Sequence, residues 1–322
     1  MNPALFVYIP TYNRPRALRR QLDSLTSQRG GWPGSLRVLV SDNASPLLSE
    51  DDLSGLRDEY DIEVRRNCAN IDANANIALG FVFARPEEYL WILSDNDFLS
   101  DHALRAIADS GFVDDPDVID FTPAVQRPTT ISHTWRQGWS GIVTEGQVCL
   151  MSNVIYKAST VGPHFKQAFY YHNTSFPHLA VLLAALREQG YLRFRVLPRD
   201  GVFLAERAHG EQAGDYSLSL SGAPQIVSLL PRREAARFCR EWLRDYGEGF
   251  MAHRHTHPQI HVGTRAALRH YGGTRVAVRL RLLTVRFAVL QPLLSDKLEP
   301  IRTRLPASVR HRVHAILRGR RW

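Results

Sequence analysis

Short apolar runs alternate with helical repeats along the N-terminal part of the chain. The runs cover residues 5–9, 36–40, 89–93 and 118–121, with a shorter candidate at 62–64. Each ends in polar or turn-forming residues, which is typical of buried strands in a parallel sheet. Helical spacing is found between the runs, at Leu18, Leu22 and Leu25, over residues 74–84, and at Ala103, Leu104 and Ile107. Strands alternating with helices predict an α/β fold with a mostly parallel, helix-covered central sheet.

Polar side chains follow three of these strands directly. Thr11 follows the first, Asp42 the second, and Asp95 and Asp97 the run at 89–93. Ligands of such sheets bind outside the carboxyl ends of the strands, and Mn²⁺ or Mg²⁺ prefers one or two carboxylates plus the phosphates of a nucleotide. The pattern therefore predicts a metal-assisted diphosphate site. The alternative is that Asp95 or Asp97 only caps a helix that begins near Asp101.

Three motifs occur at these strand ends in a fixed order. They are Ile9-Pro10-Thr11-Tyr12-Asn13-Arg14, Val40-Ser41-Asp42-Asn43-Ala44-Ser45 and Ser94-Asp95-Asn96-Asp97. With them, residues 5–120 closely resemble the nucleotide-binding half of a family 2 glycosyltransferase with the GT-A fold, which is Rossmann-like. Arg66-Asn67 and residues 70–76 together resemble the asparagine-rich segment that precedes the family's DxD strand, although Asp72 stands where the family often has Gly.

The second half of the chain has a weaker resemblance. A predicted strand at residues 152–156 and a helix start at residues 176–179 are similar to the abequosyltransferase-like branch of the family. No resemblance extends beyond about residue 220. The resemblance implies a GT-A catalytic domain over residues 1–220, with a nucleotide-sugar half (1–120) and an acceptor half (121–220), followed by a helical, basic region at 221–322.

The resemblance also implies roles for individual residues. Asp42 would hydrogen-bond the donor base, Asp95 the ribose, and Asp97 would hold Mn²⁺ or Mg²⁺, with Asp95 as a second candidate ligand. The metal would neutralise the charge that grows on the departing nucleotide. The full set of expected donor-binding residues is Pro10, Thr11, Tyr12, Asn13, Arg14, Asp42, Asn76, Asp95 and Asn96. An alternative for Asn43 and Asn76 is a turn role in left-handed backbone.

An inverting transferase also needs a base that takes the proton of the acceptor hydroxyl. The family usually supplies Asp or Glu from the second half, but residues 157–187 contain neither. His172 and His178 lie in that window, and a neutral imidazole suits the task, so we expect one of them to act, although simple packing is the alternative. Further candidates are Glu145, Asp200 and Glu206 as bases and His209 as a late metal ligand.

Composition limits the class of protein. The 322 residues are 44% hydrophobic and 22% charged, as in ordinary globular proteins, and no uncharged apolar run is long enough to span a bilayer. The three cysteines are far apart, which argues against a disulfide framework. The first residues lack the features of a secretory signal, so we expect a cytoplasmic location.

Charge is concentrated at the C-terminus. Residues 264–322 hold 13 Arg and one Lys against Asp296 and Glu299, a net charge of +12 that leaves about −4 for the rest of the chain. Residues 275–287 favour a helix with arginines on one face, which predicts contact with an anionic membrane surface and a peripheral position at its inner face. The alternative is that the aliphatic residues pack on the catalytic domain. The histidines of residues 253–261 form either a zinc site or a solvated basic loop.

These observations favour a metal-dependent, inverting glycosyltransferase. Its substrates would be a nucleotide-sugar donor and a saccharide acceptor, which the basic tail suggests is lipid-linked, in bacterial surface-polysaccharide assembly. One alternative is a nucleotidyltransferase, although residues 11–15 lack the glycine-rich loop such enzymes normally need. The other is a non-catalytic nucleic-acid-binding protein that acts through the arginine-rich tail, and we expect nucleic acid to be the less favoured partner.

Overall fold

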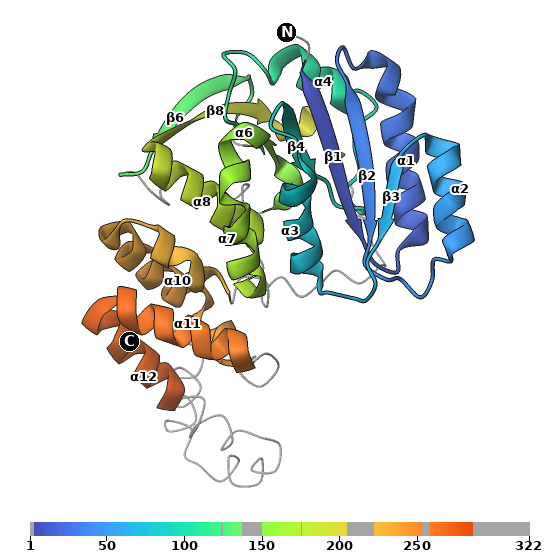
Figure 1. The fold of residues 1–322 in the computed structure, drawn as a ribbon. Coiled ribbons are helices and arrows are strands. Elements are labelled where there is room, and N and C mark those ends of the chain that lie inside the picture. The colour runs from blue at the N-terminus through green and yellow to red at the C-terminus, as the bar shows by residue number, and fades with distance from the viewer. Residues whose placement is uncertain are drawn as a thin grey trace, which may run out of the picture.

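The computed structural model describes residues 3–123, 125–136, 150–174, 176–204, 222–252 and 258–285 (Figure 1). Eight strands of these residues form one sheet in the order β3-β2-β1-β4-β7-β5-β8-β6. They are β1 (Ala4–Thr11), β2 (Leu36–Asp42), β3 (Glu63–Arg66), β4 (Glu88–Ile92), β5 (Val118–Thr122), β6 (Thr129–Thr134), β7 (Val154–Lys157) and β8 (Tyr191–Pro198). Strands β3, β2, β1 and β4 are mutually parallel, whereas β7 and β6 run antiparallel to their neighbours.

Helices cover both faces of this sheet. The α-helices are α1 (Pro15–Gln28), α2 (Glu50–Tyr60), α3 (Ala73–Phe83), α4 (Ala103–Ser110), α6 (Ala158–Val161), α7 (Phe165–Tyr170), α8 (Pro177–Gln189), α10 (Arg232–Ala252), α11 (Pro258–Tyr271) and α12 (Gly273–Val285). The 3₁₀ segments are η1 (Arg29–Gly31), η2 (Met151–Asn153), η3 (Gly162–His164), η4 (His172–Thr174), η5 (Arg199–Gly201) and η6 (Ala223–Leu229).

Alternation along β1 divides the core into two clusters. Leu5, Val7 and Ile9 point to the face covered by α1, α2 and α4, while Phe6 and Tyr8 point to the opposite face, against α3 and α8. All five side chains are at most 1% exposed, as expected for a central strand with a helical layer on each side. The predicted α/β fold with a mostly parallel sheet is confirmed.

Most elements predicted in the N-terminal part are present. Strands β1 to β5 match the predicted runs with every boundary within two residues, and α3 lies one residue from its predicted position. One prediction was wrong in detail, because the run at 152–156 begins as the 3₁₀ segment η2 and becomes strand β7 only at Val154. The hydrophobic pattern did not predict β6, β8 or α2.

The C-terminal helices α10, α11 and α12 extend the second of these clusters, which is the one that contains Phe6 and Tyr8. Leu268, Val276, Leu280 and Leu283 are buried in the same cluster as Phe6 of the central strand. The predicted helical C-terminal region is therefore present, and one face of α12 packs inward. Within the described residues, no helix combines the length and the apolar character needed to cross a bilayer.

Candidate functional site

The carboxyl ends of β1, β2 and β4 lie side by side at one edge of the sheet. Thr11, the last residue of β1, is in register with Asp42, the last residue of β2, and the backbone N–H of Leu93 after β4 donates to the carbonyl of Tyr8. Strands β2 and β3 lie on one side of β1, and the next strand along the chain, β4, lies on its other side. The strand order therefore reverses at β1. Such a switch point is where open α/β sheets bind ligands.

Asp95 connects the loops that follow β1 and β4. Its carboxylate is 3% exposed and accepts a hydrogen bond from Thr11 Oγ1 (2.8 Å) and another from Arg14 Nη1 (3.0 Å). The helix-cap alternative is wrong, because α4 begins after His102, which makes no side-chain cap. The structure thus brings together three residues that the resemblance assigned to donor binding.

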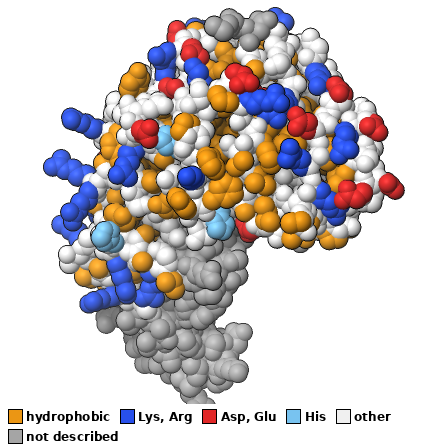
Figure 2. Space-filling model, in the orientation of Figure 1, with side chains coloured by type: hydrophobic (Ala, Val, Ile, Leu, Met, Phe, Trp, Pro, Cys, Tyr) orange, Lys and Arg blue, Asp and Glu red, His pale blue; other side chains and the backbone are white. Residues whose placement is uncertain are grey.

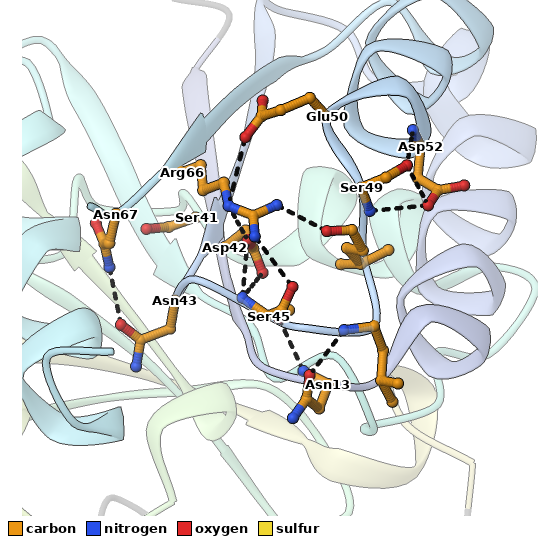
Figure 3. A network of polar contacts seen from close by, with 12 residues as sticks. Asn13, Ser41, Asp42, Asn43, Ser45, Ser49, Glu50, Asp52, Arg66 and Asn67 are labelled. Carbon is orange, nitrogen blue, oxygen red and sulfur yellow. Dashed lines mark hydrogen bonds and ion pairs between the residues drawn. The ribbon is translucent and has the colours of Figure 1, made fainter. Parts of the chain in front are cut away.

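Asp42 is held by a second cationic contact (Figure 3). Its carboxylate is fully buried, lies 3.6 Å from Arg66 Nε, and accepts hydrogen bonds from the backbone N–H of Ser45 at 3.2 and 3.3 Å. Arg66 also donates to the carbonyls of Ser45 and Leu48. Arg66 and Ser45 were not predicted as site residues, although the Asp-x-x-Ser spacing of 42–45 is a recognisable turn signal.

The loop after β1 is tied to the loop after β2. The backbone N–H of Asn13 donates to Ser45 Oγ (2.9 Å), and Asn13 Oδ1 accepts from the N–H of Leu47 (3.3 Å). Asn13 adopts left-handed backbone with φ 56°, which asparagine tolerates better than most residues. The two loops therefore present their backbones as one unit beside Asp42, as Figure 3 shows.

Asparagines of the 67–76 segment complete this edge. Asn43 accepts from Asn67 Nδ2 (3.0 Å) and donates to Asn70 (2.9 Å), while Asn76 donates to the Ser41 carbonyl (2.9 Å). Neither Asn43 nor Asn76 has a positive φ, so the alternative of a left-handed turn role is wrong for both. Asn76 is 2% exposed and serves as an internal crosslink in the structure, and its contact with a donor stays a prediction.

Tyr8 secures the start of α3 against the sheet. Its hydroxyl donates to the Asn76 carbonyl at 2.7 Å, inside the core. Burial raises the pKa of Tyr8 well above its ordinary value, and a hydrogen bond with Ser41 opposes this weakly. The phenol is therefore neutral at physiological pH and remains a hydrogen-bond donor.

The remaining predicted donor residues lie around this edge. Tyr12 is 40% exposed, so its ring is available to a planar ligand. Pro10 and Asn96 are half-buried, and Ser94 Oγ donates to Asn96 Oδ1. Asp97 is half-buried and, among the described residues, its carboxylate has no hydrogen bond or ion pair.

This donor set fits a hard cation only with help from a ligand. The described residues contain no group of three or more His, Cys, Asp or Glu side chains able to hold a metal. Asp97 offers free carboxylate oxygens, whereas both oxygens of Asp95 already accept hydrogen bonds. One or two carboxylates plus diphosphate oxygens is the arrangement that Mg²⁺ and Mn²⁺ commonly take, so the residues fit the predicted metal.

The candidate bases differ in exposure. His178, at the start of α8, is 2% exposed and lies beside the Phe176 ring. His172 is exposed, and its Nδ1 lies 2.7 Å from the Phe169 carbonyl. Because a carbonyl only accepts hydrogen bonds, Nδ1 is the donor in this contact, and in a neutral ring Nε2 is then the acceptor.

Asp200 is the third described candidate. It is exposed in η5, and the neighbouring Val202 carbonyl accepts from the N–H of Ser100 (2.9 Å), while the N–H of Leu204 donates to Phe98 (2.9 Å). The segment with Asp200 therefore lies along the loop that follows the acidic pair. The other sequence candidates, Glu145, Glu206, His209 and the histidines at 253, 255 and 257, lie outside the described residues.

Comparison with known proteins agrees with this geometry. Residues 6–162 match the family model "Glycosyl transferase family 2". Abequosyltransferase RfbV of Salmonella typhimurium is 32% identical over 101 residues, which cover 31% of this chain and 30% of that protein. The chain thus matches less than a third of that relative's length.

Solved structures with the same fold include S. aureus TarS, residues 1–349. It superimposes with a TM-score of 0.59 at 13% identity, over 99% of this chain and 93% of that one. The same protein in complex with UDP-GlcNAc gives a TM-score of 0.59 at 14% identity, with the same coverage. At this identity the likeness establishes the fold alone.

Proposed function

Because residues 6–162 match the model of glycosyl transferase family 2, we propose that the protein transfers a sugar from a nucleotide-sugar donor to a saccharide acceptor. The convergence of Thr11, Arg14, Asp42 and Asp95 at the switch point of the sheet carries this proposal. A relative named as an abequosyltransferase and a fold neighbour crystallised with UDP-GlcNAc support a nucleotide-sugar donor.

Each side chain has a task in this reaction. Asp42 accepts from the donor base, Tyr12 stacks on a planar part of the donor, and Arg14 is close enough to Asp95 to share its guanidinium between that carboxylate and the incoming diphosphate. Asp97, with Asp95, would hold Mn²⁺ or Mg²⁺, which neutralises charge on the diphosphate when it is bound.

The chemistry is proposed to invert the anomeric centre. A base, for which His172 is our choice over His178, takes the proton of the acceptor hydroxyl. The acceptor oxygen then bonds to the anomeric carbon while the bond from that carbon to the phosphate oxygen breaks, and the electron pair leaves with the nucleotide diphosphate. A bacterial surface polysaccharide, built on a lipid-linked acceptor at the cytoplasmic face of the membrane, is the setting we propose.

A thermal-shift panel tests the donor site. UDP, dTDP, GDP and CDP are added with and without Mn²⁺ or Mg²⁺ to the wild type, to Asp97→Asn, and to the control Asp101→Asn, an exposed acid in the same loop. A ligand that binds only the folded state at about 100 times its Kd should raise the melting temperature by about 4 °C.

The expected result is a metal-dependent shift with one nucleotide, lost in Asp97→Asn and kept in Asp101→Asn. Release of that nucleotide from its sugar conjugate on addition of acceptor then reports transfer. No shift with any nucleotide in the wild type would refute the donor site.

A further inference from the structure

Helices α11 and α12 carry positive charge that no acidic side chain in the described part of the chain pairs with. Residues 258–285 contain five arginines and no Asp or Glu. Within the described residues none of these five forms an ion pair, whereas several arginines of the sheet-bearing part do. The five are Arg265, Arg269, Arg275, Arg279 and Arg281.

Two faces of α12 have different environments. Val276, Leu280 and Leu283 are at most 8% exposed and pack into the core. Val278 and Arg279 lie three and four residues after Arg275, and Leu282 lies four and three residues after them, so the four share another face, which we call the α12 outer face. Val278 is 51% exposed and Leu282 is 65% exposed, so two aliphatic side chains reach solvent between two arginines.

Helix α11 also has an exposed aliphatic side chain and an exposed arginine. Val262 is 67% exposed and Arg269 is exposed. Burial, and secondly the like charge of Arg269, lowers the pKa of Arg265, and no described acidic side chain forms an ion pair with either guanidinium group. Figure 2 shows blue basic side chains without red acidic ones at the lower left, over these helices. The two helices together therefore attract anions.

The mixture of side chains indicates the kind of anion. In the headgroup region of a bilayer, guanidinium groups bind lipid phosphates while aliphatic side chains reach the acyl boundary. Single-stranded nucleic acid is bound largely by aromatic stacking, and the α12 outer face has no aromatic residue. We propose that the α12 outer face, with α11 beside it, binds the surface of an anionic lipid bilayer.

Vesicle co-sedimentation of the full chain tests this proposal independently of sugar transfer. The vesicles contain phosphatidylcholine alone or with phosphatidylserine, at low and at physiological salt. The test variants are Arg275→Gln with Arg279→Gln, and Leu282→Ser. The matched control is Arg19→Gln with Arg105→Gln, which removes the same charge from exposed positions on α1 and α4.

Each arginine near a charged membrane contributes about fivefold in affinity, so the α12 pair should weaken binding to phosphatidylserine vesicles by about 25-fold. We expect the control to bind these vesicles as tightly as the wild type does and Leu282→Ser to bind them more weakly. We expect no binding of the wild type to vesicles of phosphatidylcholine alone, and weaker binding to phosphatidylserine vesicles at the higher salt concentration. Circular dichroism checks that each variant is folded.

Other results would overturn the proposal. One is that the wild type does not bind anionic vesicles. Another is that the folded α12 double variant binds them as tightly as the wild type does, and a third is that the charge control loses as much affinity as the α12 double variant. Tighter binding of a single-stranded oligonucleotide than of anionic vesicles at physiological salt would assign the face to nucleic acid instead.

Discussion

Arg14 Nη1 lies 3.0 Å from Asp95 Oδ1, and 81 residues of sequence separate the two side chains. The carboxylate is 3% exposed and the guanidinium 34% exposed, so the pair has one side in the interior and one side open to solvent. The pair connects the loops after β1 and β4 at the switch point of the sheet. Because the Arg14 side chain is partly exposed, it can contact a second anion while it keeps its contact with Asp95.

Loss of this pair should reduce stability. Arg14→Gln removes the guanidinium from a buried carboxylate that keeps its hydrogen bond from Thr11, and we expect the free energy of unfolding to fall by about 1–3 kcal/mol, between the values for exposed and fully buried pairs. Urea unfolding measures it. Arg16→Gln, at an exposed position of α1, is the control and should change stability by less than about 0.5 kcal/mol. Equal effects of the two variants would contradict the role given to the pair.

Variants of Asp42 and Arg66 can distinguish a role in donor binding from a role in supporting the loop. Asp42→Asn and Arg66→Gln both break the 3.6 Å ion pair, but only the first removes the carboxylate proposed to accept from the donor base. We therefore expect Asp42→Asn to weaken nucleotide binding about tenfold more than Arg66→Gln does, as measured by calorimetry. Similar affinities in the two variants would mean that Asp42 only supports the loop.

The catalytic base can be identified by turnover. Since Nε2 of His172 is the hydrogen-bond acceptor of an exposed ring, we expect His172→Gln to lower kcat by about 10²- to 10⁴-fold while the thermal shift with nucleotide stays unchanged. His164→Gln, in the same part of the chain, is the control. A loss of turnover in His178→Gln or Asp200→Asn instead, with His172→Gln active, would move the role to that residue.

Burial should make one cysteine unreactive. Burial raises the pKa of Cys239 to about 12, and the positive charge of Arg240 opposes this only partly. At pH 8 the thiolate fraction is then about 10⁻⁴, so a thiol reagent should modify exposed Cys68 rapidly and Cys239 only after unfolding. Labelling of a Cys68→Ser, Cys149→Ser variant measures this. Fast labelling of that folded variant would show that the C-terminal helices open easily.

The central part of the fold was predictable because local patterns carry it. Strand β4, for example, is a run of apolar residues buried on both faces, and such a run is visible in the sequence. Strand β6 gave no signal, since five of its six residues are exposed and only one of the six, Ile131, is apolar. Helix α2 begins with a capping box between Ser49 and Asp52, a signal that the hydrophobic pattern alone does not use.

The candidate site was predictable in its members and less so in its contacts. Strand ends and the family motifs placed Thr11, Asp42 and Asp95 together, because adjacent parallel strands end at one edge. The contact of Arg14 depends on how the loops after β1 and β4 fold over that edge, and the contact of Arg66 depends on the register of the short strand β3 against β2. No local pattern records that Arg66 reaches Asp42 or that Asn76 crosslinks α3 to β2.

The continuous second cluster has a consequence for biosynthesis. Phe6 lies in the first strand, and Leu283 lies in the last described helix, yet both belong to one cluster of buried side chains. A ribosome must therefore release residues 222–285 before these helices can complete the cluster, although α3 and α8 can cover Phe6 earlier. Until then the part of the cluster that the C-terminal helices cover is open to other nascent chains, so we expect the protein to depend on chaperones during translation more than a protein whose core is completed by its own N-terminal half.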